Sequence, residues 1–309
     1  MKAFVLLALV TPVGCSEYGF DRSAAPPDGV SVDDTPTDAV EDPVDPTEPV
    51  DVPPAEEPPD EPTIPAEEPP ADDCADTSDL IYVIDRALQK LYLFDPLTLD
   101  FTALGSLDCS SGQATPASMA VSRDGFAYVR YSDNDLFAVD LVTMDCSKTP
   151  YAGASFGDFG MGFSTDAAGG WQDTLYLSSE SDLATLDLAT WTLQPVGPTP
   201  SQSELSGDAD GELWAFLPLE SPAELTHLDK AGGPPIVSYG LNGFPDAGDI
   251  DTFAFATWAG EFWLFVREYG MGKTTDVYRV TADGEMTFAL ADSGRDVVGA
   301  GVSTCAPTQ

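Results

Sequence analysis

The sequence predicts an all-β domain over residues 78–309, a five-bladed β-propeller of four-stranded blades. From residue 79 onward, no stretch keeps a 3.6-residue apolar period over the length of a helix. Short β-rich runs and turn clusters instead recur five times along this region. Each repeat spans about 46 residues, a typical length for a propeller blade.

The third strand of each blade is predicted by a repeat of three mostly apolar residues that ends in Asp or Thr. Either residue can cap a tight turn by accepting a backbone N–H bond, so each repeat reads as a strand that enters a hairpin. The capping positions are Asp95, Asp140, Asp187, Asp229 and Thr281.

The first two strands of each blade are predicted by two further repeats. Runs centred on an aromatic residue predict the second strands; they contain Tyr82, Tyr128, Tyr176, Trp214 and Trp263. Segments rich in small residues precede four of these runs and predict inner strands, which crowd around a propeller axis; they are 118–121, 161–164, 205–208 and 253–257.

The fifth small-residue segment, 298–303, lies at the other end of the repeat region. We therefore expect this last strand to complete the first blade and to leave no free sheet edge between the ends. A two-sheet sandwich also has short strands and regular turns and is the structural alternative. The displaced fifth segment argues against the sandwich.

The cysteine positions agree with a closed ring. Cys74 and Cys305 flank the repeats, and Cys109 and Cys146 lie near the outer strands of adjacent blades. We predict the pairs Cys74–Cys305 and Cys109–Cys146, one of the three pairings that four cysteines allow. A bond at the closure stabilises the ring by about 2–4 kcal/mol.

The first 14 residues predict a signal peptide, because Lys2 is followed by an apolar run, 3–10, that is too short to span a bilayer. Residues 11–15 (Thr-Pro-Val-Gly-Cys) resemble the lipobox of bacterial lipoproteins, although Pro12 stands where that family prefers Leu. The resemblance implies lipidation of Cys15, and Ser16 resembles an outer-membrane sorting signal. An ordinary secreted protein is the alternative.

Residues 15–77 predict a disordered linker behind the lipidated cysteine. Residues 16–77 contain 20 acidic residues, 14 prolines and one basic residue, Arg22. This composition offers too little apolar surface to offset the entropy of ordering the chain, and it favours an extended stalk. A spacer that holds the propeller away from a membrane is the functional interpretation; an inert solubilising tail is the alternative.

The charge of the chain excludes several classes of function. A formal net charge of −41, with 12 basic residues in total, argues against binding nucleic acid or an anionic membrane surface. The one histidine, His227, cannot form a multi-histidine metal site and falls within a predicted third strand, which indicates a structural role. We predict no cofactor, with Ca²⁺ as the one candidate ion.

Propellers usually bind ligands where the loops before the inner strands and after the second strands meet the axis. The acidic residues expected there are Asp158, Asp246, Asp249, Asp251 and Asp296. Their carboxylates could hold Ca²⁺, but acidic residues are also common in turns of so acidic a domain. The segments 208–212 and 281–284 resemble calcium loops faintly and are interpreted as turns.

A carboxylate-dependent glycoside hydrolase is the alternative function, because five-bladed enzymes of that class use Asp and Glu near the axis. Asp158, Asp251 and Asp296 are then the first catalytic candidates. Three further aromatic residues could stack on sugars or pack between blades, and packing is the preferred interpretation; they are Trp171, Trp191 and Trp258.

As a whole, the chain resembles uncharacterised lipoproteins of myxobacteria and related deltaproteobacteria. Three segments carry this resemblance: 159–163 (Phe-Gly-Met-Gly-Phe), 166–168 (Asp-Ala-Ala) and 298–307 (Val-Gly-Ala-Gly-Val-Ser-Thr-Cys-Ala-Pro). It implies an exported propeller and supplies no activity. Together with the lipobox and Ser16, it leads us to expect an outer-membrane lipoprotein that faces the periplasm or the cell surface. The leading hypothesis is a membrane-tethered interaction module that binds a protein or a glycan of the cell envelope.

Overall fold

The computed structural model describes Cys74 and residues 80–309 except residue 110. The predicted signal peptide, Cys15 and nearly all of the predicted linker lie outside the described residues. Two 3₁₀ turns, Ala154–Phe156 (η1) and Ala247–Asp249 (η2), are the helical elements of the described part. No helix there is long and apolar enough to cross a membrane.

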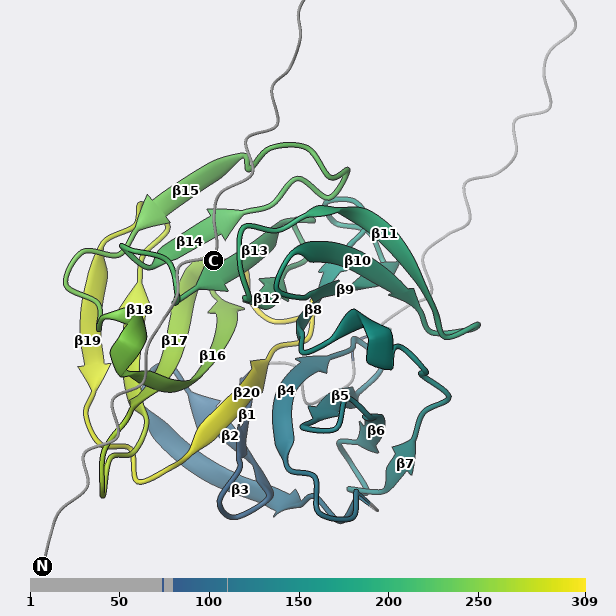
Figure 1. Cartoon of the computed structure of the whole chain (residues 1–309), viewed down its shortest axis with the longest axis horizontal. Helices are drawn as coiled ribbons and strands as arrows, with labels where there is room; N and C mark the ends of the chain where they lie inside the picture. Colours follow the sequence, from purple (N-terminus) through teal and green to yellow (C-terminus); the bar gives the residue numbers. More distant parts are fainter. Residues whose placement is uncertain (1–73, 75–79, 110) are drawn as a thin grey trace, which may run out of the picture. The chain divides into compact units, whose positions relative to one another are not determined.

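Residues 80–309 form five antiparallel sheets of four strands, which Figure 1 shows arranged in a ring. From the axis outward, blade 1 consists of β20 (Val297–Gly301), β1 (Ile81–Asp85), β2 (Lys90–Asp95) and β3 (Asp100–Ser106). Blade 2 consists of β4 (Pro116–Val121), β5 (Phe126–Tyr131), β6 (Leu136–Asp140) and β7 (Cys146–Lys148). Blade 3 consists of β8 (Gly160–Thr165), β9 (Asp173–Ser178), β10 (Asp182–Asp187) and β11 (Thr192–Pro198). Blade 4 consists of β12 (Glu204–Gly207), β13 (Leu213–Leu217), β14 (Glu224–His227) and β15 (Val237–Gly240). Blade 5 consists of β16 (Ile250–Trp258), β17 (Glu261–Glu268), β18 (Asp276–Val280) and β19 (Met286–Leu290). The five-bladed prediction is confirmed.

The ring closes where the sequence predicts. Strand β20 pairs antiparallel with β1, with Tyr82 opposite Gly301 and Ile84 opposite Gly299. Each inner strand also contacts the inner strands of the two neighbouring blades, in the circular order β20, β4, β8, β12 and β16. The sandwich alternative is therefore wrong.

The repeated turns are capped as expected. The Oδ1 atoms of Asp95, Asp140 and Asp187 each accept a backbone N–H bond of 2.8 Å from the residue two positions later, and Asp229 accepts one of 2.9 Å. In the fifth copy the hydroxyl of Thr281 accepts the N–H of Glu285 at 3.2 Å. Backbone donors hold the pKa of the Asp140 and Asp187 carboxyls below the usual value.

Close contact at the axis explains the small residues of the inner strands. A Cβ atom added to Gly162 would lie 2.6 Å from the carbonyl oxygen of Leu205, and one added to Gly207 would lie 2.5 Å from that of Phe163. Such distances are well inside van der Waals contact. Larger side chains at these positions would force blades 3 and 4 apart.

The apolar core of the described region consists of five clusters, each between two neighbouring blades. Alternate residues of a second strand belong to different clusters: Ile81 and Val83 face blade 5, and Tyr82 and Ile84 face blade 2. This two-sided burial explains why the second strands are almost continuously apolar.

The two disulfides of the structure are the predicted ones. Cys74 is bonded to Cys305, with their Cα atoms 5.9 Å apart, and Cys109 to Cys146, with their Cα atoms 5.2 Å apart. The first ties a residue ahead of β1 to the segment after β20. The second joins the segment after β3 to the first residue of β7, across blades 1 and 2.

Candidate functional site

Two concave sites lie at opposite ends of the inner strands. The first, here named the axial mouth, is a cavity of about 190 Å³ at the start of these strands, lined among others by Arg86, Arg130, Glu204 and Asp251. The second, named the inter-blade pocket, has a volume of about 370 Å³ and lies between blades 4 and 5, where β12 and β16 end. The mouth is on the face that the sequence analysis favours.

Arginines neutralise the predicted carboxylates of the axial mouth. Asp296 accepts from Arg86 at 3.0 Å and lies 3.1 Å from the Nε atom of Arg267. Asp251 pairs with the same two arginines, directly with Arg267 and at 3.9 Å with Arg86. Sequence reasoning thus placed Asp251 and Asp296 on one face, but it missed the two arginines between them.

The other predicted loop residues do not join this network. Asp158 is 66% exposed and pairs with Arg130 at 3.3 Å. Asp246 and Asp249 are exposed residues at η2, and their carbonyl oxygens accept backbone N–H groups, that of Asp246 from Asp249 itself. Of the five carboxylates of the sequence analysis, Asp251 and Asp296 thus come together, and the other three lie apart from them.

Glu204 is the carboxyl of the mouth that the sequence analysis missed. It is 4% exposed, and its Oε2 atom accepts from the hydroxyl of Ser118 at 2.8 Å. Burial raises the pKa of Glu204 to about 8, although hydrogen bonds and the charge of Arg130 favour the ionised form. Glu204 is consequently protonated at neutral pH.

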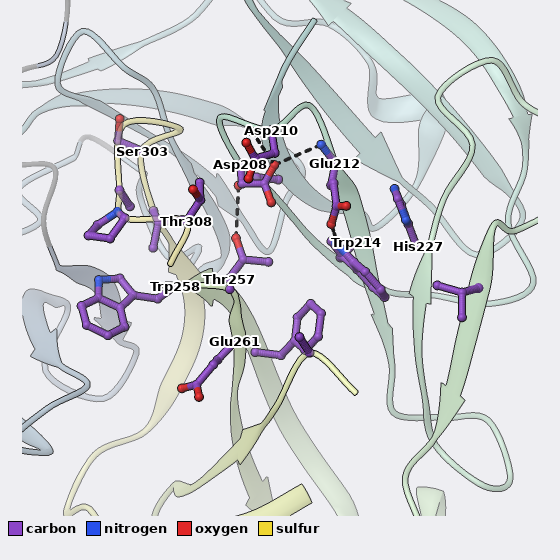
Figure 2. A pocket seen from close by; sticks show the side chains of 18 of the residues that line it. Asp208, Asp210, Glu212, Trp214, His227, Thr257, Trp258, Glu261, Ser303 and Thr308 are labelled. Atoms are coloured by element: carbon purple, nitrogen blue, oxygen red, sulfur yellow. Dashed lines mark hydrogen bonds between the residues drawn. The ribbon is translucent and has the colours of Figure 1, made fainter. Parts of the chain in front are cut away.

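Aromatic side chains form much of the wall of the inter-blade pocket. The indole of Trp214 lies 4.8 Å from the ring of His227 in a stacked arrangement and 4.6 Å from Phe262, centroid to centroid. Trp258 lies across the cavity, beside residues 302–308, which follow β20 (Figure 2). The backbone N–H of Ala259 donates to the carbonyl of Pro307 at 2.7 Å and holds that segment in place.

Three carboxylates project from the turn between β12 and β13, at the top of the view in Figure 2. Asp208 caps this turn, because its Oδ1 atom accepts the backbone N–H groups of Asp210 and Glu212, each at 3.0 Å. Glu212 accepts from the indole nitrogen of Trp214 at 2.8 Å. Burial, together with the charges of Glu212 and Asp210, raises the pKa of Asp208 to about 6.

No Lys or Arg of the described chain forms an ion pair with these three carboxylates. The ammonium of Lys230 is nearby, but it donates to the carbonyl of Thr165 at 2.7 Å and to the hydroxyl of Ser164 at 3.2 Å. The fourth acidic residue of the pocket, Glu261, is paired with Arg279. Lys230 supplies one positive charge that acts on Asp208, against three carboxylates, so this end of the pocket keeps a net negative charge.

Segment 208–212 forms a turn, as the sequence analysis interprets it, and the same turn supplies the acidic end of the pocket.

His227 packs on Trp214, and burial lowers the pKa of His227, so its imidazole is neutral at pH 7. Of the three additional tryptophans, Trp191 packs near Tyr128 and Trp258 against the core between blades 5 and 1, whereas Trp171 is 39% exposed.

The sequence contains one signal of the axial mouth, in the positions of its arginines. In a chain with 12 basic residues, three arginines stand at or near the end of a second strand: Arg86, Arg130 and Arg267.

Within the described residues, no group of three or more His, Cys, Asp or Glu side chains is arranged to hold a metal ion.

No protein-family model matches this chain, and no curated protein does. Among solved structures, a chain of the crystal structure of a nidogen/laminin complex is 12% identical with a TM-score of 0.44, over 75% of this chain and 99% of that one. A structural genomics protein of unknown function from Bacteroides thetaiotaomicron is 11% identical with a TM-score of 0.44, over 71% of this chain and 57% of that one.

Proposed function

We propose that this chain is an exported, lipid-anchored interaction module of the cell envelope, and that its propeller binds a protein or glycan through the inter-blade pocket. One observation carries the proposal: a cavity of about 370 Å³ combines aromatic walls with three carboxylates, Asp208, Asp210 and Glu212, that form no ion pair with a Lys or Arg of the described region. Concave, largely preformed cavities with a few polar groups are the usual form of ligand sites.

The tether is supported by the sequence. Residues 1–14 supply the signal peptide, Cys15 the site of lipid attachment, and residues 15–77 the spacer, in a protein of the outer membrane that faces the periplasm or the cell surface. Replacement of Cys15 by Ser should move the protein from the membrane fraction to the soluble fraction. Persistence of the variant in washed membranes would contradict lipid anchoring.

The binding role is tested by filling the pocket from its rim. Ala282 is an exposed residue of the pocket lining, so Ala282→Trp places an indole in the cavity without disturbing the core. Ala189→Trp is the matched control, because Ala189 is exposed on the corresponding turn of blade 3 and lies outside the pocket. Both variants of the full chain are cross-linked in the envelope, and the recovered partners are compared.

We expect Ala282→Trp to abolish recovery of a partner that the control and the unmodified chain both retain. Equal recovery with both variants would show that the pocket does not bind the partner. Melting temperatures of the purified variants verify that both remain folded.

A carboxylate-dependent glycoside hydrolase is the alternative function, and Glu204 is its candidate general acid. Glu204 and Asp251 line the same axial cavity, and burial raises the pKa of Glu204 to about 8, so it is protonated at pH 7 as a general acid must be. The pairing of Asp251 with Arg86 and Arg267 speaks against a free catalytic base. Turnover of an oligosaccharide panel, abolished by Glu204→Gln or Asp251→Asn, would establish the enzyme.

A further inference from the structure

The charge of the inter-blade pocket indicates the chemical class of its ligand. This inference rests on the proposed binding role. Asp208, Asp210 and Glu212 line one end of the cavity, and none of them pairs with a Lys or Arg of the described chain. The ammonium of Lys230 donates to Thr165 and Ser164, and its single positive charge also acts on Asp208. A ligand that enters this end meets a negative potential.

The fixed position of Glu212 favours the same class of ligand. The indole of Trp214 donates its N–H to Glu212, which directs the carboxylate and the ring edge to one place. Trp258 lies on the other side of the cavity (Figure 2). A carboxylate that is held in place can form a charge-assisted hydrogen bond with an ammonium or guanidinium group.

A neutral sugar fits the walls less well. Pyranose rings bind by stacking on an open aromatic face, but Trp214 is only 6% exposed, with His227 stacked on it and Phe262 tilted against it. Anionic ligands are excluded by the carboxylates. The acidic linker of this chain is excluded for the same reason, since residues 16–77 carry 20 acidic residues against one basic residue.

We infer that the inter-blade pocket binds a cationic side chain, the ammonium of Lys or the guanidinium of Arg, presented by a basic segment of a partner protein. A protein is favoured over a small free amine because residues 78–309 carry 33 acidic against 10 basic residues. This surplus attracts a polybasic surface over distances of about 10 Å at moderate salt. The pocket then receives one side chain of that surface, and the surrounding carboxylates orient the rest.

The inference is tested by calorimetry on the full chain carrying Cys15→Ser, which removes the lipid attachment site. The probe is a nonapeptide of alternating Gly and Lys, with an Arg version and a version in which every Lys is acetylated. We expect the Lys or the Arg peptide to bind, and acetylation to weaken binding by about tenfold or more, because it removes the charge.

The decisive variant is Asp210→Asn with Glu212→Gln, which removes two charges and retains the acceptor for the Trp214 N–H. Asp100→Asn with Asp145→Asn is its matched control, since both residues are exposed outside the pocket and the change in net charge is the same. We expect the pocket variant to lose about tenfold in affinity and the control to lose less than about twofold.

Each outcome decides one proposal. Equal losses in the two double variants would overturn the inference, because binding would then depend on net charge alone. Absence of peptide binding, with partner recovery still abolished by Ala282→Trp, would overturn the cationic ligand and leave the proposed function intact. Binding of a neutral oligosaccharide or of Ca²⁺ in place of the peptides would also overturn it. Unchanged partner recovery with Ala282→Trp would refute the proposed function itself.

Discussion

The axial mouth and the inter-blade pocket are built from the same kind of residue and have opposite electrostatics. At the mouth, Asp251 and Asp296 share Arg86 and Arg267, so the charges cancel within the protein. In the pocket, the carboxylates of the β12–β13 turn form no ion pair with a Lys or Arg of the described residues. The comparison shows that acidic composition alone does not define a site. The positions of the few basic residues decide whether a group of carboxylates keeps a net negative charge.

The largest expected effect comes from the disulfides, of which only Cys74–Cys305 lies beside the inter-blade pocket. Loss of either bond, by Cys74→Ser with Cys305→Ser or by Cys109→Ser with Cys146→Ser, should lower the free energy of unfolding by about 2–5 kcal/mol. Only loss of the first should weaken peptide binding, because Cys305 lies between residues that line the pocket. Urea unfolding and calorimetry measure the two effects. Equal loss of binding in both variants would contradict this distinction.

The second prediction concerns the ion pairs of the mouth. Arg267→Ala leaves Asp251 and Asp296 with one arginine between them in a partly buried place, so it should destabilise the fold by about 2 kcal/mol. Lys273→Ala breaks only an exposed pair with Glu268 and should have little effect. Urea unfolding of both variants checks this. If Arg267→Ala were neutral, the mouth would not depend on its internal charge balance.

The third prediction uses the raised pKa of Glu204. Between the unfolded pKa, near 4.5, and the folded value of about 8, the folded chain retains a proton that the unfolded chain has lost, so stability falls as pH rises. Glu204→Gln cannot ionise and should become more stable than the unmodified protein, by about 1–3 kcal/mol, as pH rises from 5 to 8. Denaturant unfolding at several pH values measures the difference, and parallel curves would contradict it.

The smallest effect is expected in the pocket. The pKa of Asp208 is raised to about 6, so its ionisation costs stability as pH rises from about 4 to 6 and above. Asp208→Asn preserves the acceptor of the turn and should stabilise the protein at pH 7 by about 0.5–1 kcal/mol, a value reduced for partial exposure to solvent. At pH 4 the two proteins should be equally stable. A gain of the same size at both pH values would point to a cause other than charge.

Most of the fold could be predicted because the propeller repeats a local pattern. The capping Asp residues, such as Asp140, act within their own turns, and small residues such as Gly162 reflect a crowding that every blade shares. Closure by segment 298–303 was also predictable, because one repeat lacked its inner strand. Strand boundaries differ from the prediction by a few residues at most places, as with β16, which begins at Ile250 rather than at 253.

The candidate site was less predictable, because its residues come together from separate blades. Arg86 and Asp296 are 210 positions apart in the chain, yet their side chains are hydrogen-bonded. Asp208, Asp210 and Glu212 read as an ordinary turn, and only the packing of blade 5 and residues 302–308 beside that turn makes a pocket of it.

The sequence by itself determined the number of blades, the strand that closes the ring and the acidity of the whole chain, because each follows from local patterns or from counting. Only the tertiary structure decided which carboxylates are neutralised and which remain uncompensated. The physical reason is that electrostatic energy depends on the distance between charges and on their burial, and both are set by blades that meet across long stretches of sequence.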